Sequence, residues 1–354
     1  MSQSNEPINR EQENTEKKLG EIPISVLDLS QVLEGHTAAD AFRDSLDLAQ
    51  HAEKWGYHRY WVAEHHNMPG VASSATSVVI GYLAAGTSTI RVGAGGIMLP
   101  NHAPLVIAEQ FGTLESMYPG RIDLGLGRAP GSDRRTSLAL RRDINSGEDF
   151  PQLLEELRNY FDTSKTSYHA PIRAVPGEGL NIPIWLLGSS DFSARLAGSL
   201  GLPFSFAGHF SPDYLDRALN VYRNTFTPSD TLDKPYVMLG VSVIAADTQE
   251  RAEMLSTTMQ QQVVALTRGR PGKIQPPADL SLQLDPLELT AVRKRMESSI
   301  VGDRETVERR LHELMARTQA DELIVTSGIY DHNERLHSYE ILADIAIPSG
   351  QSAL

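Results

Sequence analysis

Residues 90–102 of this chain read IRVGAGGIMLPNH, and residues 121–130 read RIDLGLGRAP. Each stretch begins with β-forming apolar residues and then becomes rich in glycine, as expected where a strand ends at a bend or against a ligand. Both lack the third glycine of the Gly-x-Gly-x-x-Gly pattern of dinucleotide-binding sheets, and the sequence has no Walker A motif. The two stretches therefore argue against an open, doubly wound nucleotide-binding sheet.

Apolar runs of this kind recur along the chain and alternate with stretches of helical periodicity. Thr37 and Asp40 form a capping-box pattern at a helix start. Pro104 suits another helix start, and Gly56 suits a helix end. Eight alternating units in about 330 residues fit a (β/α)8 TIM barrel of parallel strands, with the open sheet as the alternative. The predicted strands are Ile22–Leu27, Tyr57–Ala63, Ile90–Leu99, Arg121–Leu126, Ile182–Leu187, Pro203–Ala207, Tyr236–Ala245 and Glu322–Ser327.

Two stretches interrupt the repeat and are predicted to be insertions. Tyr168–Asn181 is rich in proline and glycine and precedes the fifth strand. Arg268–Asp285 is rich in glycine, proline and polar residues and precedes the eighth strand. A barrel tolerates such insertions as loops, so each stretch is either a lid over a substrate site or a plain surface excursion.

Composition excludes several classes of protein. The chain has 354 residues, with 32 basic against 45 acidic side chains and a net charge of −13. It has no basic run, so binding to duplex nucleic acid or to an anionic membrane is not expected. The absence of cysteine excludes disulfides, thiolate catalysis and cysteine-ligated metal sites, and it is compatible with a reducing cytoplasm.

The first twenty residues are polar and contain no apolar segment typical of a signal peptide. We expect a disordered tail over residues 1–20 and a single barrel domain over residues 21–348. No apolar run approaches the roughly 18 residues that a membrane span requires, so a cytoplasmic protein is expected.

The residues that follow the strands matter most, because the active site of a barrel lies at the carboxyl ends of its strands. The second strand leads into His65 and His66. One of these should face the barrel mouth as an acid, a base or a hydrogen-bond donor, unless it is a core histidine. Neighbouring residues of a strand point to opposite faces, so the pair is not expected to share a metal ion.

Other strand ends offer complementary groups. Bare backbone at Gly95 and Gly96 could approach a flat ring or form a kink. Arg128 could pair with an anionic ligand or form a structural salt bridge, whereas Arg134–Arg135 and Arg141–Arg142 are predicted to form a solvated helix face. Ser189, Ser190 and Ser193 open a helix, where hydroxyls and free backbone N–H groups could bind phosphate or only cap the helix. Gly208-His209-Phe210 is a weak signal after the sixth strand. This rim is a plausible seat for a phosphorylated flat cofactor.

Three motifs in order carry a family resemblance. They are Trp61-x-x-Glu64-His65-His66, Gly93-Ala94-Gly95-Gly96-Ile97-Met98-Leu99-Pro100 and Pro119-Gly120-Arg121-x-x-x-Gly125-x-Gly127-Arg128. They resemble the bacterial-luciferase-like flavin monooxygenases, and the similarity covers residues 22–347. The single-chain branch of that family is the most similar, through the stretches GYHRYWVAEHHN, GLGRAPGSDRRT and LLGSS.

The resemblance implies a (β/α)8 barrel that binds reduced FMN or, in another branch, the deazaflavin F420. His65 matches the family's catalytic histidine. Gly95-Gly96 matches a non-proline cis peptide beneath the isoalloxazine, with which glycine is compatible. Arg128 matches an arginine that contacts the flavin phosphate or pyrimidine side. Ser189 matches a phosphate-binding serine, and local geometry extends this assignment to Ser190 and Ser193.

The sequence also departs from the family pattern. The luciferase catalytic subunit has a cysteine where this chain has Gly127, and a glutamate beside the phosphate serine where this chain has Gly188. Gly188 is still counted among the predicted cofactor-binding residues. No residue indicates a long-chain aldehyde pocket, so light emission is not implied.

The implied activity is a two-component monooxygenase. A separate NAD(P)H:flavin reductase would supply FMNH2, O2 would form a C4a-(hydro)peroxyflavin, and one oxygen atom would pass to a small organic substrate. His65 would act as an acid or base, or stabilise the peroxide, while His66, His102 and His209 are candidates for the substrate pocket. A homodimer is expected from the family. The alternatives are an F420-dependent dehydrogenase, a non-catalytic flavin carrier and, more distantly, a metal-dependent hydrolase, for which no ligand set is present.

Overall fold

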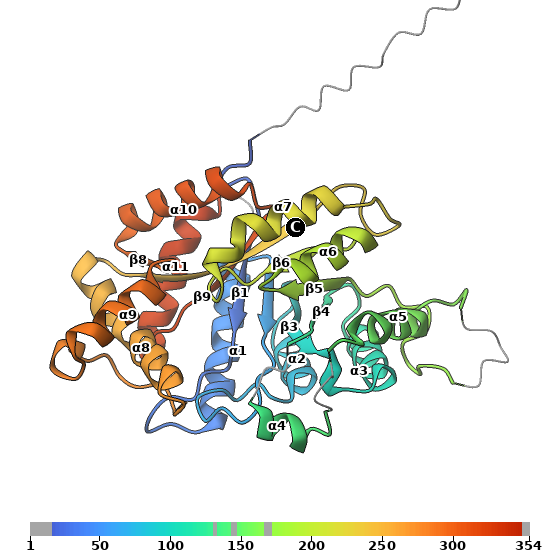
Figure 1. Ribbon diagram of the computed structural model, residues 1–354, viewed down its shortest axis with the longest axis horizontal. Coiled ribbons are helices and arrows are strands. Elements are labelled where there is room, and N and C mark those ends of the chain that lie inside the picture. Colours follow the sequence, from blue (N-terminus) through green and yellow to red (C-terminus); the bar gives the residue numbers. More distant parts are fainter. Residues whose placement is uncertain (1–15, 130–132, 143–146, 166–171, 349–354) are drawn as a thin grey trace, which may run out of the picture.

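Eight parallel strands close into a barrel in the computed structural model, which describes residues 16–129, 133–142, 147–165 and 172–348. Around the barrel the neighbours are β1 to β6 in sequence order, then β7 and β9, and β9 returns to β1. The predicted (β/α)8 barrel is confirmed (Figure 1). The strands are β1 (Ile24–Asp28), β2 (Arg59–Val62), β3 (Arg91–Met98), β4 (Ile122–Gly127), β5 (Ile184–Gly188), β6 (Phe204–Phe206), β7 (Val237–Ala245) and β9 (Glu322–Thr326).

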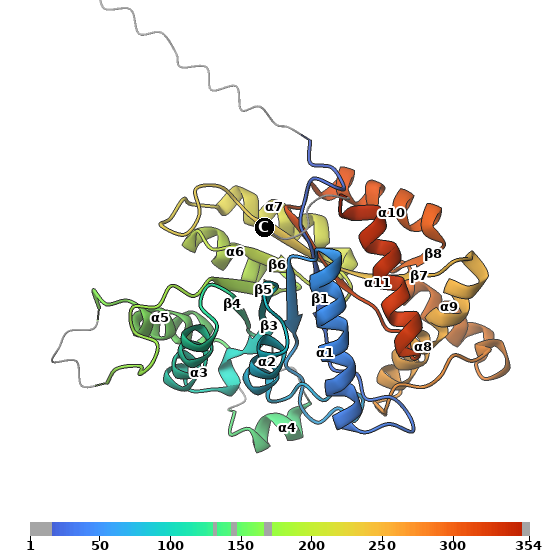
Figure 2. The ribbon, with the colours of Figure 1, turned by 180° about the vertical axis from the view of Figure 1, so that it is seen from behind.

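Helices cover the outside of the barrel (Figure 2). Side chains of the helices and strands pack together in one large apolar core. The capping box of Thr37 and Asp40 is present, Gly56 ends the first helix in the left-handed conformation, and a helix begins at Pro104, all as predicted. The main helices are α1 (Ala38–Trp55), α2 (Thr76–Ala85), α3 (Pro104–Met117), α5 (Phe150–Phe161), α6 (Asp191–Leu200), α7 (Leu215–Thr225), α10 (Arg304–Thr318) and α11 (His332–Ala346). None of the helices in the described ranges is long and apolar enough to cross a bilayer.

Further elements were not predicted as such. The strand β8 (Ile300–Gly302) pairs only with the last three residues of β7, outside the closed barrel. The helices α8 (Gln249–Thr267) and α9 (Pro286–Met296) precede it, and α4 (Arg134–Ala139) lies between β4 and α5. Three short 3-10 helices complete the described elements: η1 (Leu99–Asn101), η2 (Pro212–Tyr214) and η3 (Leu280–Leu282).

The barrel interior is layered. At the amino-terminal ends of the strands, Arg59 lies between Asp123, at 2.7 Å, and Glu322, at 3.0 Å. Above this charged layer, Trp61 and Trp185 pack edge to face with ring centroids 5.3 Å apart. Because these two layers fill the lower half of the barrel, the open space lies at the carboxyl ends of the strands.

The two predicted insertions lie at opposite ends of the barrel. The described part of Tyr168–Asn181 joins α5 to the start of β5, and Gly177 packs against Ala108 of α3. The lid interpretation is therefore wrong for this stretch, because a loop before a strand lies away from the carboxyl ends; residues 168–171 lie outside the described residues. Arg268–Asp285 follows α8 and reaches the mouth, where Ile274 pairs with Leu33.

The structure describes only residues 16–20 of the predicted disordered tail. Residues 1–15 lie outside the described residues. Residues 16–20 contact the barrel domain, since the Lys17 ammonium lies 2.6 Å from Asp321 and Leu19 packs against the core.

Candidate active site

A cavity of about 260 Å³ lies inside the mouth of the barrel, above the layer formed by Trp61. Leu27 and Ile324 contribute apolar lining at its floor, and segments that follow several strands form its walls. The structure brings nine of the predicted site residues together around this space: His65, Gly95, Gly96, Arg128, Gly188, Ser189, Ser190, Ser193 and His209.

One wall is bare backbone from β3. The peptide bond between Gly95 and Gly96 is cis, as the family resemblance implied, and the register with β4 shifts between Ala94 and Ile97. A Cβ atom at Gly95 would lie 2.7 Å from the Leu27 side chain, and one at Gly96 would lie 2.7 Å from the Gly125 carbonyl oxygen. Glycine is thus required at position 96, where the close contact is with backbone, while at position 95 a side chain would push against the Leu27 methyl group. The wall is therefore bare backbone, which suits a planar ring.

The opposite end of the cavity suits an anion. The Arg128 guanidinium lies 4.1 Å from the centre of the Phe192 ring, and no carboxylate among the described residues forms an ion pair with it. Ser190 occupies the N-cap position of α6, but its hydroxyl makes no capping hydrogen bond. A cation, three serines and the start of α6 therefore lie at one end of the cavity. This composition suits a phosphate group.

Gly188 is explained by close packing at this end. A Cβ atom there would lie 2.5 Å from the Cβ atom of Ser193. A larger residue, such as the glutamate of the luciferase subunit, would displace Ser193 from the start of α6. The glycine therefore allows a serine to approach where the family pattern places an acid.

A buried carboxylate organises the residues behind the site. Glu64 is fully buried and accepts hydrogen bonds from the His66 ring at 2.8 Å, the His102 ring at 3.0 Å and the Asn101 amide at 3.0 Å. Burial alone would raise the pKa of Glu64, but the hydrogen bond and charge of His102, with those from Asn101 and the Met98 N–H, bring it below its usual value. Glu64 thus stays ionised at neutral pH and fixes the segments that follow β2 and β3.

The histidines predicted for the substrate pocket separate into different environments. His102 bonds Glu64 and is absent from the lining of the cavities described here, so its position does not support a pocket role. His66 bonds Glu64 and only borders the outer space described below. His209 lies in the inner cavity, where burial is the main cause that lowers its pKa to about 4, so it is neutral at physiological pH.

A second cavity of about 590 Å³ lies outside the first, and His65, Leu29 and Phe210 line both. Its far wall comes from the end of α8 and from residues 270–275 of the predicted second insertion. His65 therefore stands between the inner space and the outer one. Its backbone is held in place, because the Ser74 hydroxyl donates to its carbonyl oxygen at 2.8 Å.

The sequence matches the model of the luciferase-like monooxygenases over residues 22–322. The chain belongs to the luciferase-like monooxygenase family. It is 54% identical to a luciferase-like monooxygenase of Escherichia coli K12, covering 92% of this chain and 97% of that protein. It is 59% identical to the uncharacterised protein YvbT of Bacillus subtilis, covering 91% of this chain and 96% of that protein.

More distant relatives and solved structures of the same fold were also found. The N-acetyl-S-alkylcysteine monooxygenase of Bacillus subtilis is 34% identical, over 92% of this chain and 98% of that protein. The crystal structure of apo MsnO8 superposes with a TM-score of 0.84 at 36% identity, over 93% of this chain and all of that one. An FMN complex of a 3,6-diketocamphane monooxygenase, at 18% identity and a TM-score of 0.69, shares the fold. An F420-dependent secondary alcohol dehydrogenase, at 15% identity and a TM-score of 0.66, also shares it.

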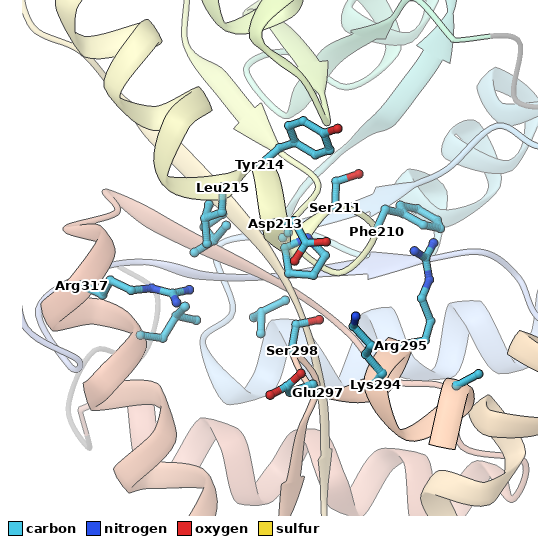
Figure 3. Close-up of a pocket in the computed structure, with 17 residues that line it drawn as sticks. Phe210, Ser211, Asp213, Tyr214, Leu215, Lys294, Arg295, Glu297, Ser298 and Arg317 are labelled. Carbon is cyan, nitrogen blue, oxygen red and sulfur yellow. The ribbon is translucent and has the colours of Figure 1, made fainter. Parts of the chain in front are cut away.

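This luciferase-like chain also has a polar hollow of about 570 Å³ beside the mouth (Figure 3). Lys294 and Arg295 extend into it from α9, Arg317 comes from α10, and Asp213 and Glu297 bring the opposite charge. It adjoins the inner cavity through Phe210 and Gly240. Its mixed charge sets it apart from the apolar spaces on either side of His65.

Two site features were missed by sequence reasoning. Arg142 was predicted to be solvated, but it is buried, and its guanidinium donates to the Arg128 carbonyl oxygen at 2.9 Å and to Asn101 at 3.2 Å. The prediction was wrong because these hydrogen bonds hold the Arg142 side chain against the barrel mouth instead of in solvent. Phe192, the ring beneath Arg128, carried no signal beyond its place after the serines.

Proposed function

We propose that the chain is the oxygenase component of a two-component FMN monooxygenase, and that His65 is its catalytic residue. The observation that carries the proposal is the single cavity that combines a flat glycine wall, an anion end at Arg128 and a histidine at its outer boundary. The residues fit FMN: the isoalloxazine would lie on Gly95-Gly96, and Arg128 with Ser189, Ser190 and Ser193 would hold its phosphate. Reduced flavin supplies the electrons that activate O2.

The protein itself would position the flavin and the substrate, exclude water and transfer protons. The apolar floor and the loop Arg268–Asp285 at the mouth would keep bulk water from the flavin. His65 lies at the boundary with the outer cavity, where its imidazole could hold or deliver a proton between the flavin and the substrate. We propose that Arg268–Asp285 acts as the substrate lid, since residues 270–275 line the outer cavity.

The choice of FMN over F420 is part of the proposal. The Escherichia coli relative at 54% identity and the Bacillus subtilis relative at 34% identity are both named monooxygenases, whereas the F420-dependent dehydrogenase has 15% identity. The oxygenase component of trigonelline monooxygenase, a flavin-dependent enzyme, is a further relative, at 21% identity over 65% of this chain. We also propose that a separate reductase supplies the reduced flavin, that the protein is cytoplasmic and that it forms a homodimer.

Oxygen labelling tests this function. The protein is mixed anaerobically with FMNH2 and then with ¹⁸O₂, in the presence of N-acetyl-S-ethylcysteine as a thioether and camphor as a cyclic ketone. We expect mass spectrometry to find one ¹⁸O atom in the product of at least one compound. Two results together would overturn the proposal in favour of an F420-dependent dehydrogenase. All flavin electrons would end in hydrogen peroxide, and reduced F420 would transfer a hydride to a ketone and form the alcohol.

The phosphate seat gives a second prediction. Replacing Ser189 and Ser190 together by alanine removes two donors from the anion end, and charge-assisted hydrogen bonds of this kind contribute about 1.5–3 kcal/mol each. We expect the double variant to bind FMN at least tenfold more weakly while riboflavin, which has no phosphate, binds nearly as before. Flavin fluorescence quenching measures both constants, and Ser199→Ala, at the exposed end of α6, is the matched control. Equal losses for the two flavins would remove the phosphate seat.

A further inference from the structure

The loop after α8 brings two cations to the outer cavity. Arg270 and Lys273 belong to its far wall, whereas His65 lies at its boundary with the inner cavity. The volume of 590 Å³ falls within the range of roughly 300–1,000 Å³ that is usual for sites of small molecules. The apolar side chains of the lining are Leu29, Met68, Val71, Ala265, Leu266 and Ile274.

The backbone of Arg270 is fixed by the way in which α8 ends. Gly269 has the left-handed conformation, with φ of 65°, and its N–H donates to the Leu266 carbonyl at 3.0 Å. The Arg270 N–H donates to the Ala265 carbonyl at 2.8 Å. These two bonds form a Schellman motif, which satisfies the last carbonyl groups of the helix through backbone N–H groups. The Arg270 side chain is therefore not needed to cap α8.

The two arginines on either side of Gly269 have different surroundings. The Arg268 guanidinium lies 2.6 Å from the Glu288 carboxylate and does not line the outer cavity. The Arg270 side chain lines the cavity and has neither an ion pair nor a hydrogen bond with any described residue. The Lys273 ammonium donates to the His36 carbonyl at 2.7 Å, and no carboxylate in the described part of the chain pairs with it.

The carboxylate in the lining, that of Asp133, is already used by the fold. One of its oxygens accepts from the Thr136 hydroxyl at 2.8 Å and the Asn67 amide at 3.1 Å. The other accepts from the N–H groups of Arg135, at 2.8 Å, and Thr136, at 3.1 Å. Four hydrogen bonds therefore compensate this negative charge, whereas the positive charge of the far wall has no such partner.

An apolar space with cations at its far wall complements a molecule with an apolar body and an anionic end. A carboxylate matches the planar fork of a guanidinium group and can share its second oxygen with an ammonium group. The corresponding neutral amide has almost the same shape but carries an NH2 donor, which has no acceptor in a guanidinium or ammonium group.

We propose that the outer cavity recognises small organic carboxylates, with the carboxylate group at Arg270 and Lys273. The apolar end of the substrate would extend toward His65 and the flavin, and it would carry the atom that is oxygenated. This inference rests on the proposed function and deepens it, since it names the substrate class of the same site.

Titration calorimetry tests the inference with probes that differ in charge. The acids are N-acetyl-S-ethylcysteine, hexanoic acid and 3-phenylpropanoic acid, and each is compared with its own primary amide. Every probe is titrated at neutral pH into the protein with oxidised FMN and into the protein without flavin. Because both cations are accessible to solvent, each contact is modest, and we expect at least one acid to bind about tenfold more tightly than its amide.

Variants assign the preference to the two cations. Arg270→Gln and Lys273→Gln should each weaken the binding of the acid about two- to fivefold, and the double variant should abolish the preference while the amide binds as before. Arg270→Lys keeps the charge and should retain part of the preference. Arg293→Gln is the matched control, because it removes the same charge from an exposed position of α9 outside the cavity lining. Circular dichroism and the Tm show which variants are folded, and the single variants carry the test if the double variant is not.

The results distinguish failure of this inference from failure of the proposed function. The inference is overturned if none of the three acids binds more tightly than its amide, or if the preference persists in the folded variants of Arg270 and Lys273. Selective binding of an acid without ¹⁸O in any product would support the inference and overturn the oxygenase function. Incorporation of ¹⁸O into camphor, with no preference for the acids, would have the opposite meaning.

Discussion

The His65→Ala variant is expected to bind FMN as tightly as the unaltered chain and to lose oxygenation by a factor of about 10²–10⁴. The imidazole lies at the boundary of the inner and outer cavities, whereas Arg128 and the serines form the anion end that we propose for the phosphate. Removing the imidazole therefore removes a proton-handling group and leaves the main binding contacts in place.

Two measurements separate these effects. Fluorescence quenching gives the dissociation constant of FMN, and single-turnover mixing of the FMNH2 complex with O2 gives the fraction of flavin electrons that end in oxygenated product rather than in hydrogen peroxide. We expect an unchanged dissociation constant and nearly complete conversion to peroxide. His312→Ala is the matched control, since this histidine is exposed on α10, far from the mouth. Unchanged product formation in His65→Ala would remove His65 from the mechanism.

The strand ends could be predicted from the sequence because their signals are local. The glycines at 95 and 96 stand out as bare backbone at the end of a strand, and the serines after β5 stand out at the start of a helix. The eight barrel strands were found within a few residues, since each combines β-branched and apolar residues between turn signals.

What the sequence could not reveal depends on contacts between distant segments. β8 has only three residues, and it becomes a strand because β7 extends beyond the barrel and offers it a partner. His102 resembled a pocket residue, but its ring is hydrogen-bonded to the carboxylate of Glu64, 38 positions away, and does not line the cavities. Arg268 and Arg270 look alike in the sequence, and only the fold pairs the first with Glu288 and places the second in the lining of the outer cavity.

The charged layer below the site gives the largest expected effect on stability. Arg59 is nearly buried, pairs with Asp123 and Glu322, and lies 4.8 Å from the centre of the Trp185 ring. Arg59→Met would leave Glu322 without a cation, whereas Asp123 would keep its ion pair with Arg91 at 2.6 Å. Removing one partner of a buried ion pair costs about 3–5 kcal/mol. We expect this loss in the free energy of unfolding, measured by urea denaturation at pH 7.

The sign of the pH dependence provides a check on the cause. Burial is the main factor that raises the pKa of Glu322 above its usual value, and Arg59 opposes this rise. Without the arginine, the folded state holds a proton on Glu322 more tightly still. The resulting loss of stability is therefore present at neutral pH and lessens as the pH falls toward 4.5, the ordinary pKa of a glutamate. The deficit of Arg59→Met relative to the unaltered chain should therefore shrink on mild acidification.

A double variant and an exposed pair complete the argument. The double variant Arg59→Met with Glu322→Gln removes the buried carboxylate together with its cation. The Ser25 and Tyr236 hydroxyls can still contact the new side-chain amide at position 322. We therefore expect the double variant to recover part of the free energy of unfolding that Arg59→Met loses. Arg309→Met breaks the exposed pair with Glu313 and should cost less than about 1 kcal/mol. If Arg59→Met cost no more than Arg309→Met, the charged layer would not stabilise the floor of the active site, and the apolar layer of Trp61 and Trp185 would have to support it alone.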